Sequence, residues 1–347
     1  MRIQVNARNR GYEFDARPGE KLLHAGLRGG IDLPYECSTG TCGTCKATLI
    51  RGRVAEGWAE APGKKFLKSG AREILMCQCV AEDEVMLEVP KFVHPMEPGA
   101  CVPEANAGTV HRTRRLAHDV TGFSVELERP CDFDAGQFLL LAPTGLAGFR
   151  GYSMCNFARG ARELEFVVKR KPEGHFSEWL FGANRDEERL QAFGPLGKAV
   201  FDPGLGKNIL CIAGGSGIAG MMSILARAAD ERYFERHSAW VYFGVRAMRD
   251  AFYLDELAAY ARRFPGKLSV TLALSEDDVP AQAARERPEL GFAKGLVHEV
   301  AKRAMAGKYQ NLRAYVAGPP PAVDAAIRML LLEAKLTTDN IRYDKYS

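Results

Sequence analysis

Three cysteines stand close together near the N-terminus, at Cys37, Cys42 and Cys45. Their C-x4-C-x2-C spacing is the plant-type signature of a [2Fe-2S] cluster, in which four thiolates hold two irons. The fourth ligand must come from further along the chain, where Cys77 and Cys79 are the candidates. The intervening residues are small, so backbone N–H groups can approach the sulfurs. A zinc site would favour two C-x2-C pairs or histidines at fixed spacing, and neither accompanies this loop.

A second set of residues fits a flavin nucleotide. Arg150-Gly-Tyr152-Ser153 offers a cation for a phosphate, an aromatic ring for the flavin face and a hydroxyl for its edge. Further along, Gly174-His-Phe-Ser177 offers a glycine, backbone N–H groups and a hydroxyl that could cradle a pyrophosphate. Taken alone, the first tetrapeptide equally fits an exposed arginine and a cross-strand tyrosine.

A third set follows the apolar segment 210–213. Gly214-Gly-Ser-Gly217 turns this expected strand into a helix, and such a turn presents N–H groups to an anion. It is not the G-x-G-x-x-G fingerprint, and a glycine-rich turn can also be merely structural. Arg246 and Arg249 follow the next apolar strand, where an arginine could bind a 2′-phosphate or stack on adenine.

The elements that must position the cysteines occupy residues 1–93. Alternating segments at 2–5 and 12–15 indicate a β-hairpin, and the apolar positions over 20–27 indicate a short helix packed on it. The segment is therefore a small α+β module. Residues 94–106 follow with three prolines and no apolar periodicity, which is typical of a semi-rigid linker.

The other two sets belong to two further modules, each expected to have a core separate from the first. Short β-rich runs over residues 107–204 predict an antiparallel β-barrel. Residues 205–347 alternate apolar strands with amphipathic helices, which predicts an α/β doubly wound parallel sheet with ligands at the carboxyl ends of its strands. The fold class is thus multidomain.

Composition excludes several classes of function. The 347 residues are 46% hydrophobic and 26% charged, with a formal net charge of +4, so neither wholesale disorder nor a nucleic-acid or membrane partner is indicated. No run approaches the ~18 apolar residues of a membrane span, and no signal sequence is visible, so we expect a cytoplasmic protein. Nine cysteines in a reducing compartment favour cluster ligation over disulfides.

The cysteine motifs Pro-Tyr-Glu-Cys37, Cys42-Gly-Thr-Cys45 and Leu-Met-Cys77-Gln-Cys79 resemble the ferredoxin domain of bacterial oxygenase reductases. The resemblance implies a β-grasp fold and a fourth ligand in an L-x-C pattern, which selects Cys77 and leaves Cys79 a spare thiol. The implied metal ligands are Cys37, Cys42, Cys45 and Cys77.

The flavin motifs resemble R-x-Y-S and G-x-x-S of the ferredoxin-NADP reductase superfamily, and they occur in the same order. The resemblance implies FAD, held by Arg150, Tyr152, Ser153, Gly174, His175, Phe176 and Ser177. The C-terminal Tyr343-Asp-Lys-Tyr346 is similar to the aromatic tail that approaches the flavin in that superfamily. Ser153 and Tyr346 are therefore the expected catalytic residues.

The nucleotide motifs resemble the superfamily's A-G-G-T-G-I-A-P loop and its C-G-P-P segment near the C-terminus. The implied contacts are Gly214, Gly215, Ser216, Gly217, Arg246, Gly318 and Pro319. Two residues depart from the pattern: Gly220 replaces a proline and Ala317 replaces a cysteine, which bears on how the nicotinamide docks. The resemblance favours NADH, with NADPH as the alternative.

The whole module order resembles the NAD(P)H-dependent reductases of bacterial multicomponent oxygenases, such as toluene, phenol and methane monooxygenases. It implies electron transfer from NAD(P)H through FAD and a [2Fe-2S] cluster to a diiron monooxygenase. The alternatives are the reductase of a Rieske-type dioxygenase and a redox-sensing binding protein. The expected partner is an oxygenase component or its Rieske ferredoxin, and a monomer is expected. Residues 1–93 carry 14 Lys or Arg and 12 Asp or Glu, which predicts weakly charge-driven docking near 38–44.

Overall fold

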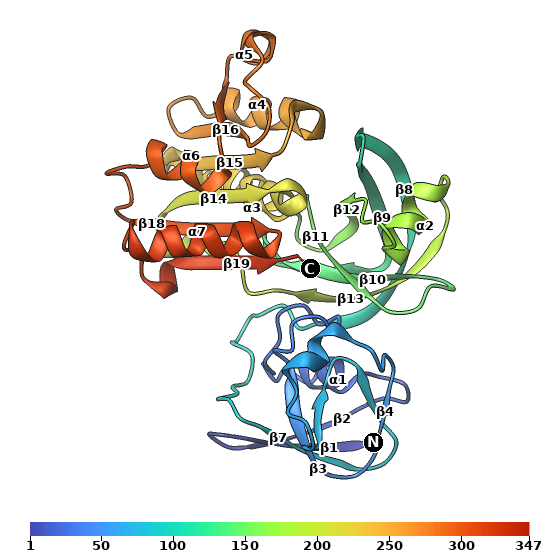
Figure 1. The fold of residues 1–347 in the computed structure, drawn as a ribbon. Coiled ribbons are helices and arrows are strands. Elements are labelled where there is room, and N and C mark those ends of the chain that lie inside the picture. The colour runs from blue at the N-terminus through green and yellow to red at the C-terminus, as the bar shows by residue number, and fades with distance from the viewer. Residues whose placement is uncertain (347) are drawn as a thin grey trace.

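The computed structural model describes residues 1–346, which form three sheet-based modules (Figure 1). The N-terminal module lies at one end of the molecule, and the other two lie side by side next to it. Within residues 1–346, no helix is both long and apolar enough to span a membrane.

The N-terminal module is a mixed five-stranded sheet in the order β2-β1-β7-β3-β5, with helix α1 packed on it, as the β-grasp prediction requires. β1 pairs antiparallel with β2 and parallel with β7. Ile3 and Val5 of β1 face the same side because strand side chains alternate, and both are buried with Leu23 of α1. The elements are β1 (Arg2–Ala7), β2 (Gly11–Asp15), α1 (Leu22–Arg28), β3 (Lys46–Arg51), β4 (Val54–Glu56), η1 (Pro62–Phe66), β5 (Glu73–Leu75), β6 (Cys79–Ala81) and β7 (Val85–Val89).

The second module is a six-stranded antiparallel sheet in the order β11-β10-β13-β8-β9-β12, curved into a half-barrel (Figure 1). Its first strand begins at Glu104, so the last three residues of the predicted linker are strand. Backbone pairing explains this, since Ala105 lies opposite Phe193. The elements are β8 (Glu104–Ala117), β9 (Val120–Cys131), β10 (Phe138–Pro143), β11 (Arg150–Ser153), β12 (Ala161–Lys169), α2 (His175–Gly182) and β13 (Arg189–Leu196).

The third module is a parallel sheet in the order β17-β16-β15-β14-β18-β19. β14 contributes to both of its cores: Cys211 packs with α3 and Ile212 with α6 and α7. This is the doubly wound arrangement predicted. The helices are η2 (Pro203–Leu205), η3 (Gly215–Gly217), α3 (Ile218–Asp230), η4 (Tyr233–Glu235), η5 (Met248–Asp250), α4 (Leu254–Arg263), α5 (Ala281–Glu286), α6 (Val297–Ala304), α7 (Pro320–Leu332) and η6 (Thr338–Asn340). The strands are β14 (Asn208–Gly214), β15 (Ala239–Val245), β16 (Leu268–Leu274), β17 (Leu290–Lys294), β18 (Leu312–Gly318) and β19 (Ile341–Lys345).

The expectation of separate cores is wrong on both sides of the half-barrel. Val120 and Val167 of the half-barrel belong to a buried cluster of the third module. Phe138 and Leu140 of β10 and Phe193 of β13 belong to the same buried cluster as the N-terminal core. His24 of α1 stacks on Phe193 with ring centroids 4.0 Å apart. The outer face of the half-barrel carries apolar side chains that only a second layer can bury, and the N-terminal module is that layer.

Candidate functional site

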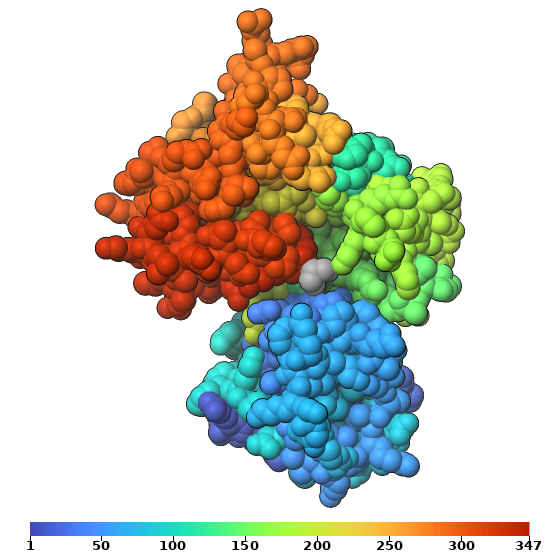
Figure 2. All heavy atoms as spheres, viewed as in Figure 1, coloured from blue at the N-terminus to red at the C-terminus, as the bar shows by residue number. Residues whose placement is uncertain are grey.

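A cavity of about 1480 Å³ lies where the three modules meet. It is lined by the cysteine loop with Cys37 and Cys42, by Ser153 of β11, by Ser177 of α2 and by Tyr346 near the C-terminus. Figure 2 shows the N-terminal module packed against the other two. The cavity therefore brings together the cysteine and flavin motifs, which are far apart in the sequence.

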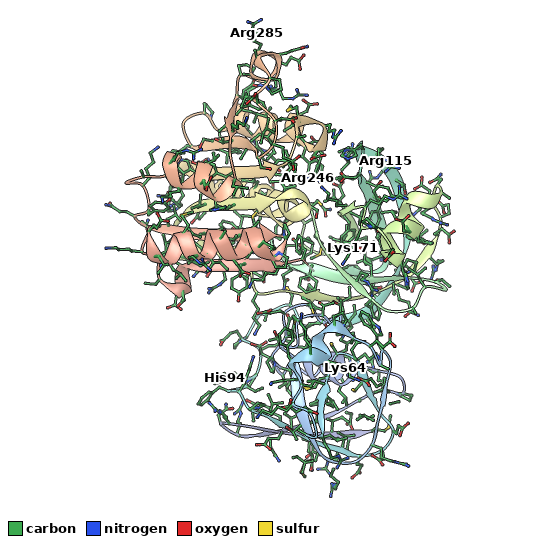
Figure 3. All side chains as sticks on the ribbon, viewed as in Figure 1. Lys64, His94, Arg115, Lys171, Arg246 and Arg285 are labelled. Carbon is green, nitrogen blue, oxygen red and sulfur yellow. The ribbon has the colours of Figure 1, made fainter. Side chains whose placement is uncertain are left out.

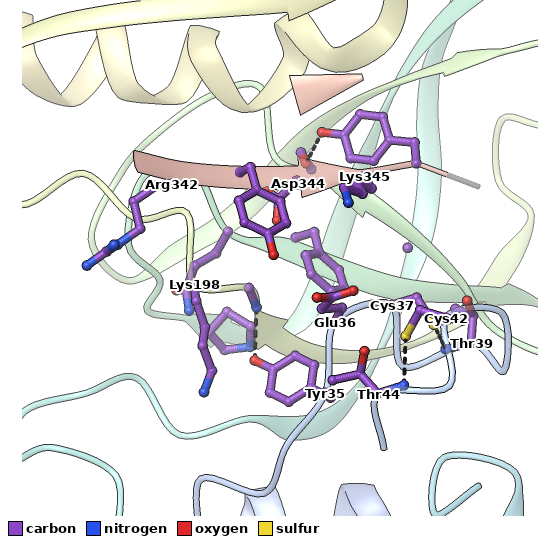
Figure 4. A pocket seen from close by; sticks show the side chains of 18 of the residues that line it. Tyr35, Glu36, Cys37, Thr39, Cys42, Thr44, Lys198, Arg342, Asp344 and Lys345 are labelled. Carbon is purple, nitrogen blue, oxygen red and sulfur yellow. Dashed lines mark hydrogen bonds between the residues drawn. The ribbon is translucent and has the colours of Figure 1, made fainter. Parts of the chain in front are cut away.

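The cysteine loop aims backbone N–H groups at sulfur. The N–H groups of Thr39 and Cys42 each lie 3.4 Å from Cys37 Sγ, and Thr44 N lies 3.5 Å from Cys42 Sγ (Figure 4). The loop turns sharply because Gly40 and Gly43 take φ of 87° and 74°, where a side chain would be strained. Donors of this kind stabilise thiolates and tune a cluster held by them.

The fourth cysteine of the group is Cys77. Cys77 Sγ lies 3.3 Å from Cys45 Sγ, and Gln78 Nε2 lies 3.5 Å from Cys77 Sγ. Cys79 begins β6 opposite Glu56 and is buried, and this burial raises the pKa of its thiol to about 12. Four thiols gathered at one loop match the number and kind of donors that a [2Fe-2S] cluster requires.

The flavin motif forms β11, one edge of the half-barrel. Ser153 Oγ lies 2.8 Å from Tyr346 Oη, so the two expected catalytic residues are hydrogen-bonded to each other across 193 positions. Ser153 is 4% exposed. The ring of Tyr152 packs against Phe176 at 4.6 Å. The guanidinium of Arg150 lies 5.8 Å from the ring of Trp58 in the N-terminal module.

The turn before α2 is preorganised by Ser177. Its hydroxyl accepts a hydrogen bond from Lys171 N at 3.0 Å and faces the carbonyls of Lys171 and Gly174 at 2.9 and 3.0 Å. The hydroxyl thus holds the turn, which leaves the N–H groups at the start of α2 to face an anion. Phe176 is buried beneath Tyr152, and His175 is exposed.

The glycine loop between β14 and α3 lies directly against the end of β18. A Cβ on Gly217 would be 2.3 Å from the Ala317 carbonyl, and one on Gly318 would be 3.0 Å from the Gly214 carbonyl. Only glycine permits this approach. The structure therefore brings the two predicted nucleotide motifs together, with Ser216 lining the cavity and Pro319 preceding α7. Gly215 supplies the left-handed turn at φ 54°.

Gly220, one of the two departures from the family pattern, faces the flavin motif. A Cβ there would lie 3.7 Å from Ser153 Oγ. The Gly220 carbonyl accepts a hydrogen bond from Ser223, whose Oγ in turn accepts one from Gly136 N at 2.9 Å. The start of α3 is thus tied to the half-barrel.

Arg246 follows β15 and is 57% exposed, at the edge where the second and third modules meet (Figure 3). Its Nε lies 3.6 Å from Asp250 Oδ2, and Asp250 is buried. His118 of the half-barrel lies 3.5 Å from the other oxygen of Asp250. Arg246 is therefore held by a carboxylate, with its guanidinium still open to solvent.

Sequence reasoning missed an acidic pair in the cavity. Glu36, next to Cys37, and Asp344 of the tail come from opposite ends of the chain to face one space (Figure 4). Burial raises the pKa of Asp344 to about 7, and the charge of Glu36 adds to the rise. Nothing local in the sequence signals this pair, because it forms only when the tail crosses to the N-terminal module.

A chain that combines a cysteine cluster site, a flavin site and a nucleotide site has the features of an electron-transfer oxidoreductase. Comparisons with known protein families agree with this class. A 2Fe-2S iron-sulfur cluster binding domain matches residues 5–82, an oxidoreductase FAD-binding domain matches 107–201, and an oxidoreductase NAD-binding domain matches 211–328. The protein is an oxidoreductase that binds a [2Fe-2S] cluster, FAD and NAD(P)H.

Similar proteins narrow the class to one family. The chain is 34% identical over 334 residues to the ferredoxin–NAD(P)+ reductase CarAd of Metapseudomonas resinovorans, covering 94% of this chain and 95% of that one. It is 31% identical over 324 residues to the xylene/toluene monooxygenase electron transfer component XylA of Pseudomonas putida, covering 93% and 87%. The solved ferredoxin reductase in carbazole 1,9a-dioxygenase superimposes with a TM-score of 0.83 at 32% identity, covering 100% and 99%. The chain belongs to the family of electron-transfer reductase components of oxygenase systems.

Proposed function

We propose that this protein takes a hydride from NADH and passes single electrons to the hydroxylase of a diiron monooxygenase. The observation that carries the proposal is the single cavity lined by the cysteine loop, β11 and the turn before α2. A flavin bound there supplies the conversion of an electron pair into single electrons, and a [2Fe-2S] cluster carries them one at a time. The relationship to the xylene/toluene monooxygenase component supports this acceptor.

The residues around the cavity have three roles in this proposal. Cys37, Cys42, Cys45 and Cys77 hold the cluster. Arg150, Tyr152 and the turn from Gly174 to Ser177 hold FAD, since this turn directs backbone N–H groups toward an anion. The Gly214–Gly217 loop, Gly318, Pro319 and Arg246 hold the nicotinamide nucleotide.

Ser153 and Tyr346 act where the flavin and nucleotide sites meet. Their 2.8 Å hydrogen bond fixes both side chains, and the burial of Ser153 excludes water from its hydroxyl. Asp344, two residues before Tyr346, can hold a proton at neutral pH because its pKa is raised to about 7. We assign Ser153 and Tyr346 to orienting the reacting groups and Asp344 to holding a proton close to them.

The proposal is tested with the purified protein carrying iron and FAD. NADH should reduce ferricyanide and cytochrome c steadily, and adding a diiron hydroxylase with its substrate should couple NADH oxidation to product formation. Steady turnover also separates a reductase from a redox sensor, which would bind a partner without sustained NADH oxidation. Uncoupled NADH oxidation with every diiron hydroxylase tried would overturn the proposed acceptor.

A Rieske-type dioxygenase is the second candidate acceptor. The observation that favours it is the match, over nearly the full length, to the reductase in carbazole 1,9a-dioxygenase. Supplying a Rieske ferredoxin and a diiron hydroxylase in the same assay, each at limiting concentration, distinguishes the two acceptors by which one is reduced faster.

We further propose that the chain acts as a monomer in the cytoplasm and divides into 1–93, a linker from 94, a flavin module ending near 204 and a nucleotide module over 205–347. The preference for NADH belongs to the same proposal. Sedimentation of the purified protein at micromolar concentration tests the monomer, and a dimer would contradict it.

A further inference from the structure

A basic segment with an exposed aromatic ring borders the cysteine loop. Residues 62–72 contain three lysines, one arginine and no acidic residue, although the module as a whole is nearly neutral. Lys64 pairs with Glu56 at 2.8 Å. Within residues 1–346, the side chains of Lys65 and Lys68 form no ion pair. The backbone N–H of Lys68 donates a hydrogen bond to the carboxylate of Glu73, but the Lys68 ammonium group does not contact it. Two lysine charges are therefore available to a partner.

The aromatic ring belongs to Phe66, which is 49% exposed. It lies on the cysteine loop itself, because a Cβ on Gly43 would come within 2.5 Å of Phe66 Cδ2. Gly43 directly follows Cys42. A protein surface that contacts Phe66 is thus separated from a cysteine of the loop by little more than one side chain.

The side of the loop that carries Ser38 is covered by the second module. Ser38 is 3% exposed and lies 3.2 Å from His24, which is itself covered by Phe193. Cys37 lines the cavity shared with the flavin motif. Figure 3 places Lys64, and with it η1, on the part of the N-terminal module nearest the other two modules. Lys65 and Phe66 also line this cavity, so η1 lies at its rim, where Phe66 stays exposed beside the loop.

We propose that Lys65, Phe66 and Lys68, here called the η1 patch, dock the acidic surface of the electron-accepting protein. The inference rests on the proposed function and adds the chemistry of the partner. An exposed aromatic residue is the side-chain type that anchors small interfaces. Unpaired lysines around it select an acidic surface and speed its approach at low salt. The module as a whole is nearly neutral, so its net charge does not reveal this local cluster of positive charge.

The test uses two one-electron haem proteins of opposite charge as acceptors, acidic cytochrome b5 and basic cytochrome c. The variant is Lys65→Glu/Lys68→Glu. Its kcat/KM for cytochrome b5 should fall about tenfold at low ionic strength, and that for cytochrome c should rise severalfold. Both changes should shrink at high salt, because screening weakens contacts between exposed charges.

The matched control is Arg8→Glu/Arg51→Glu, which makes the same charge change within the same module. Both arginines are exposed, and Arg51 lies five residues along β3 from Lys46, which is about 16 Å of strand. The control should change both rates by less than about twofold. Equal effects of the two double variants, or no effect of Lys65→Glu/Lys68→Glu, would overturn the η1 patch.

Ferricyanide separates this inference from the proposed function. It is a small acceptor that takes electrons from the flavin directly, so its reduction should be equal in all variants. Suppose the wild-type protein reduced ferricyanide but neither haem protein. This result would refute electron transfer out of the protein through the cluster, and with it the η1 patch. The cluster absorption spectrum of each variant verifies that the loop is intact.

Discussion

The half-barrel meets its two neighbours through chemically different junctions. Toward the N-terminal module the buried part of the contact is apolar and neutral: His24 is buried and stacked on Phe193. Burial lowers the pKa of His24 to about 4, so the ring is neutral at pH 7. Gly197 N donates a 3.0 Å hydrogen bond to Tyr35 Oη, and a salt bridge between Lys198 and Asp32 lies at the exposed edge.

Toward the nucleotide module, charged groups add to the apolar contact. Arg227 of α3 is buried and bonds Asp134 of the half-barrel at 2.9 Å. His118 lies between Asp119, at 3.8 Å, and Asp250 of the nucleotide module, at 3.5 Å. Ser153 and Tyr346 cross the same junction.

The two junctions suit the two kinds of transfer in the proposed function. A stacked apolar contact keeps its geometry over a wide range of salt, which suits an electron path of fixed length between flavin and cluster sites. An ionic and hydrogen-bonded contact responds to charge and to a new ligand. In our proposal the nicotinamide nucleotide binds at this second junction.

Removing a cluster ligand should break the electron path at the first junction and leave the second intact. In Cys42→Ser, cytochrome c reduction should fall about 100-fold, because one of four thiolates is missing. Ferricyanide reduction should remain near the wild-type rate. Cys42 is only half-buried and lies outside the shared core, so FAD should stay bound.

The matched control for that variant is Cys79→Ser. We expect it to keep its iron and visible spectrum, since Cys79 is the spare thiol in our assignment. Loss of the cluster in Cys79→Ser, with retention in Cys77→Ser, would move the fourth ligand to Cys79.

Acid should weaken the first junction through His24. Its folded pKa of about 4 lies below the unfolded value of 6.5, so the unfolded state binds the proton first. The contribution to stability is complete above pH 6.5 and is lost as the pH falls toward 4, by up to about 3 kcal/mol. Thermal unfolding at pH 7.5 and pH 5 measures the loss.

His24→Phe is the control for the pH effect, because it keeps a stacked ring without a titratable group. The destabilisation between pH 7.5 and pH 5 should be smaller in this variant than in the wild type. An identical pH dependence in both proteins would show that other groups cause it.

The hydrogen bond across the second junction should matter for hydride transfer and not for the cluster. In Ser153→Ala, stopped-flow reduction of the flavin by NADH should slow about tenfold, since one hydrogen bond that orients the site is lost. Tyr346→Phe removes the same bond from the other side and should give a similar loss. The double variant should then be little worse than either single variant, and fully additive effects would refute a shared role.

Of these substitutions, replacing Arg246 should have the smallest effect on catalysis. If the protein uses NADH, Arg246→Ala should change kcat/KM for NADH by less than about threefold, because NADH has no 2′-phosphate for the exposed guanidinium to bind. A wild-type preference for NADPH that collapses in Arg246→Ala would show that the arginine binds a 2′-phosphate.

Much of the site could be predicted from short segments. The C-x4-C-x2-C loop, the Arg150–Ser153 strand and the Gly214–Gly217 turn each form within a few residues, where spacing and residue type dictate local geometry. The alternation of strands and helices after residue 204 likewise predicted the parallel sheet, because hydrophobic periodicity is a local property.

Only the tertiary structure decided which residues far apart in the sequence come into contact. The bond between Ser153 and Tyr346, the pair of Glu36 and Asp344, and the stacking of His24 on Phe193 join residues more than 150 positions apart. Each depends on how three modules pack, and a buried contact between modules leaves no periodic trace in either segment. For the same reason the sequence predicted separate cores where the half-barrel and the N-terminal module bury one apolar surface together.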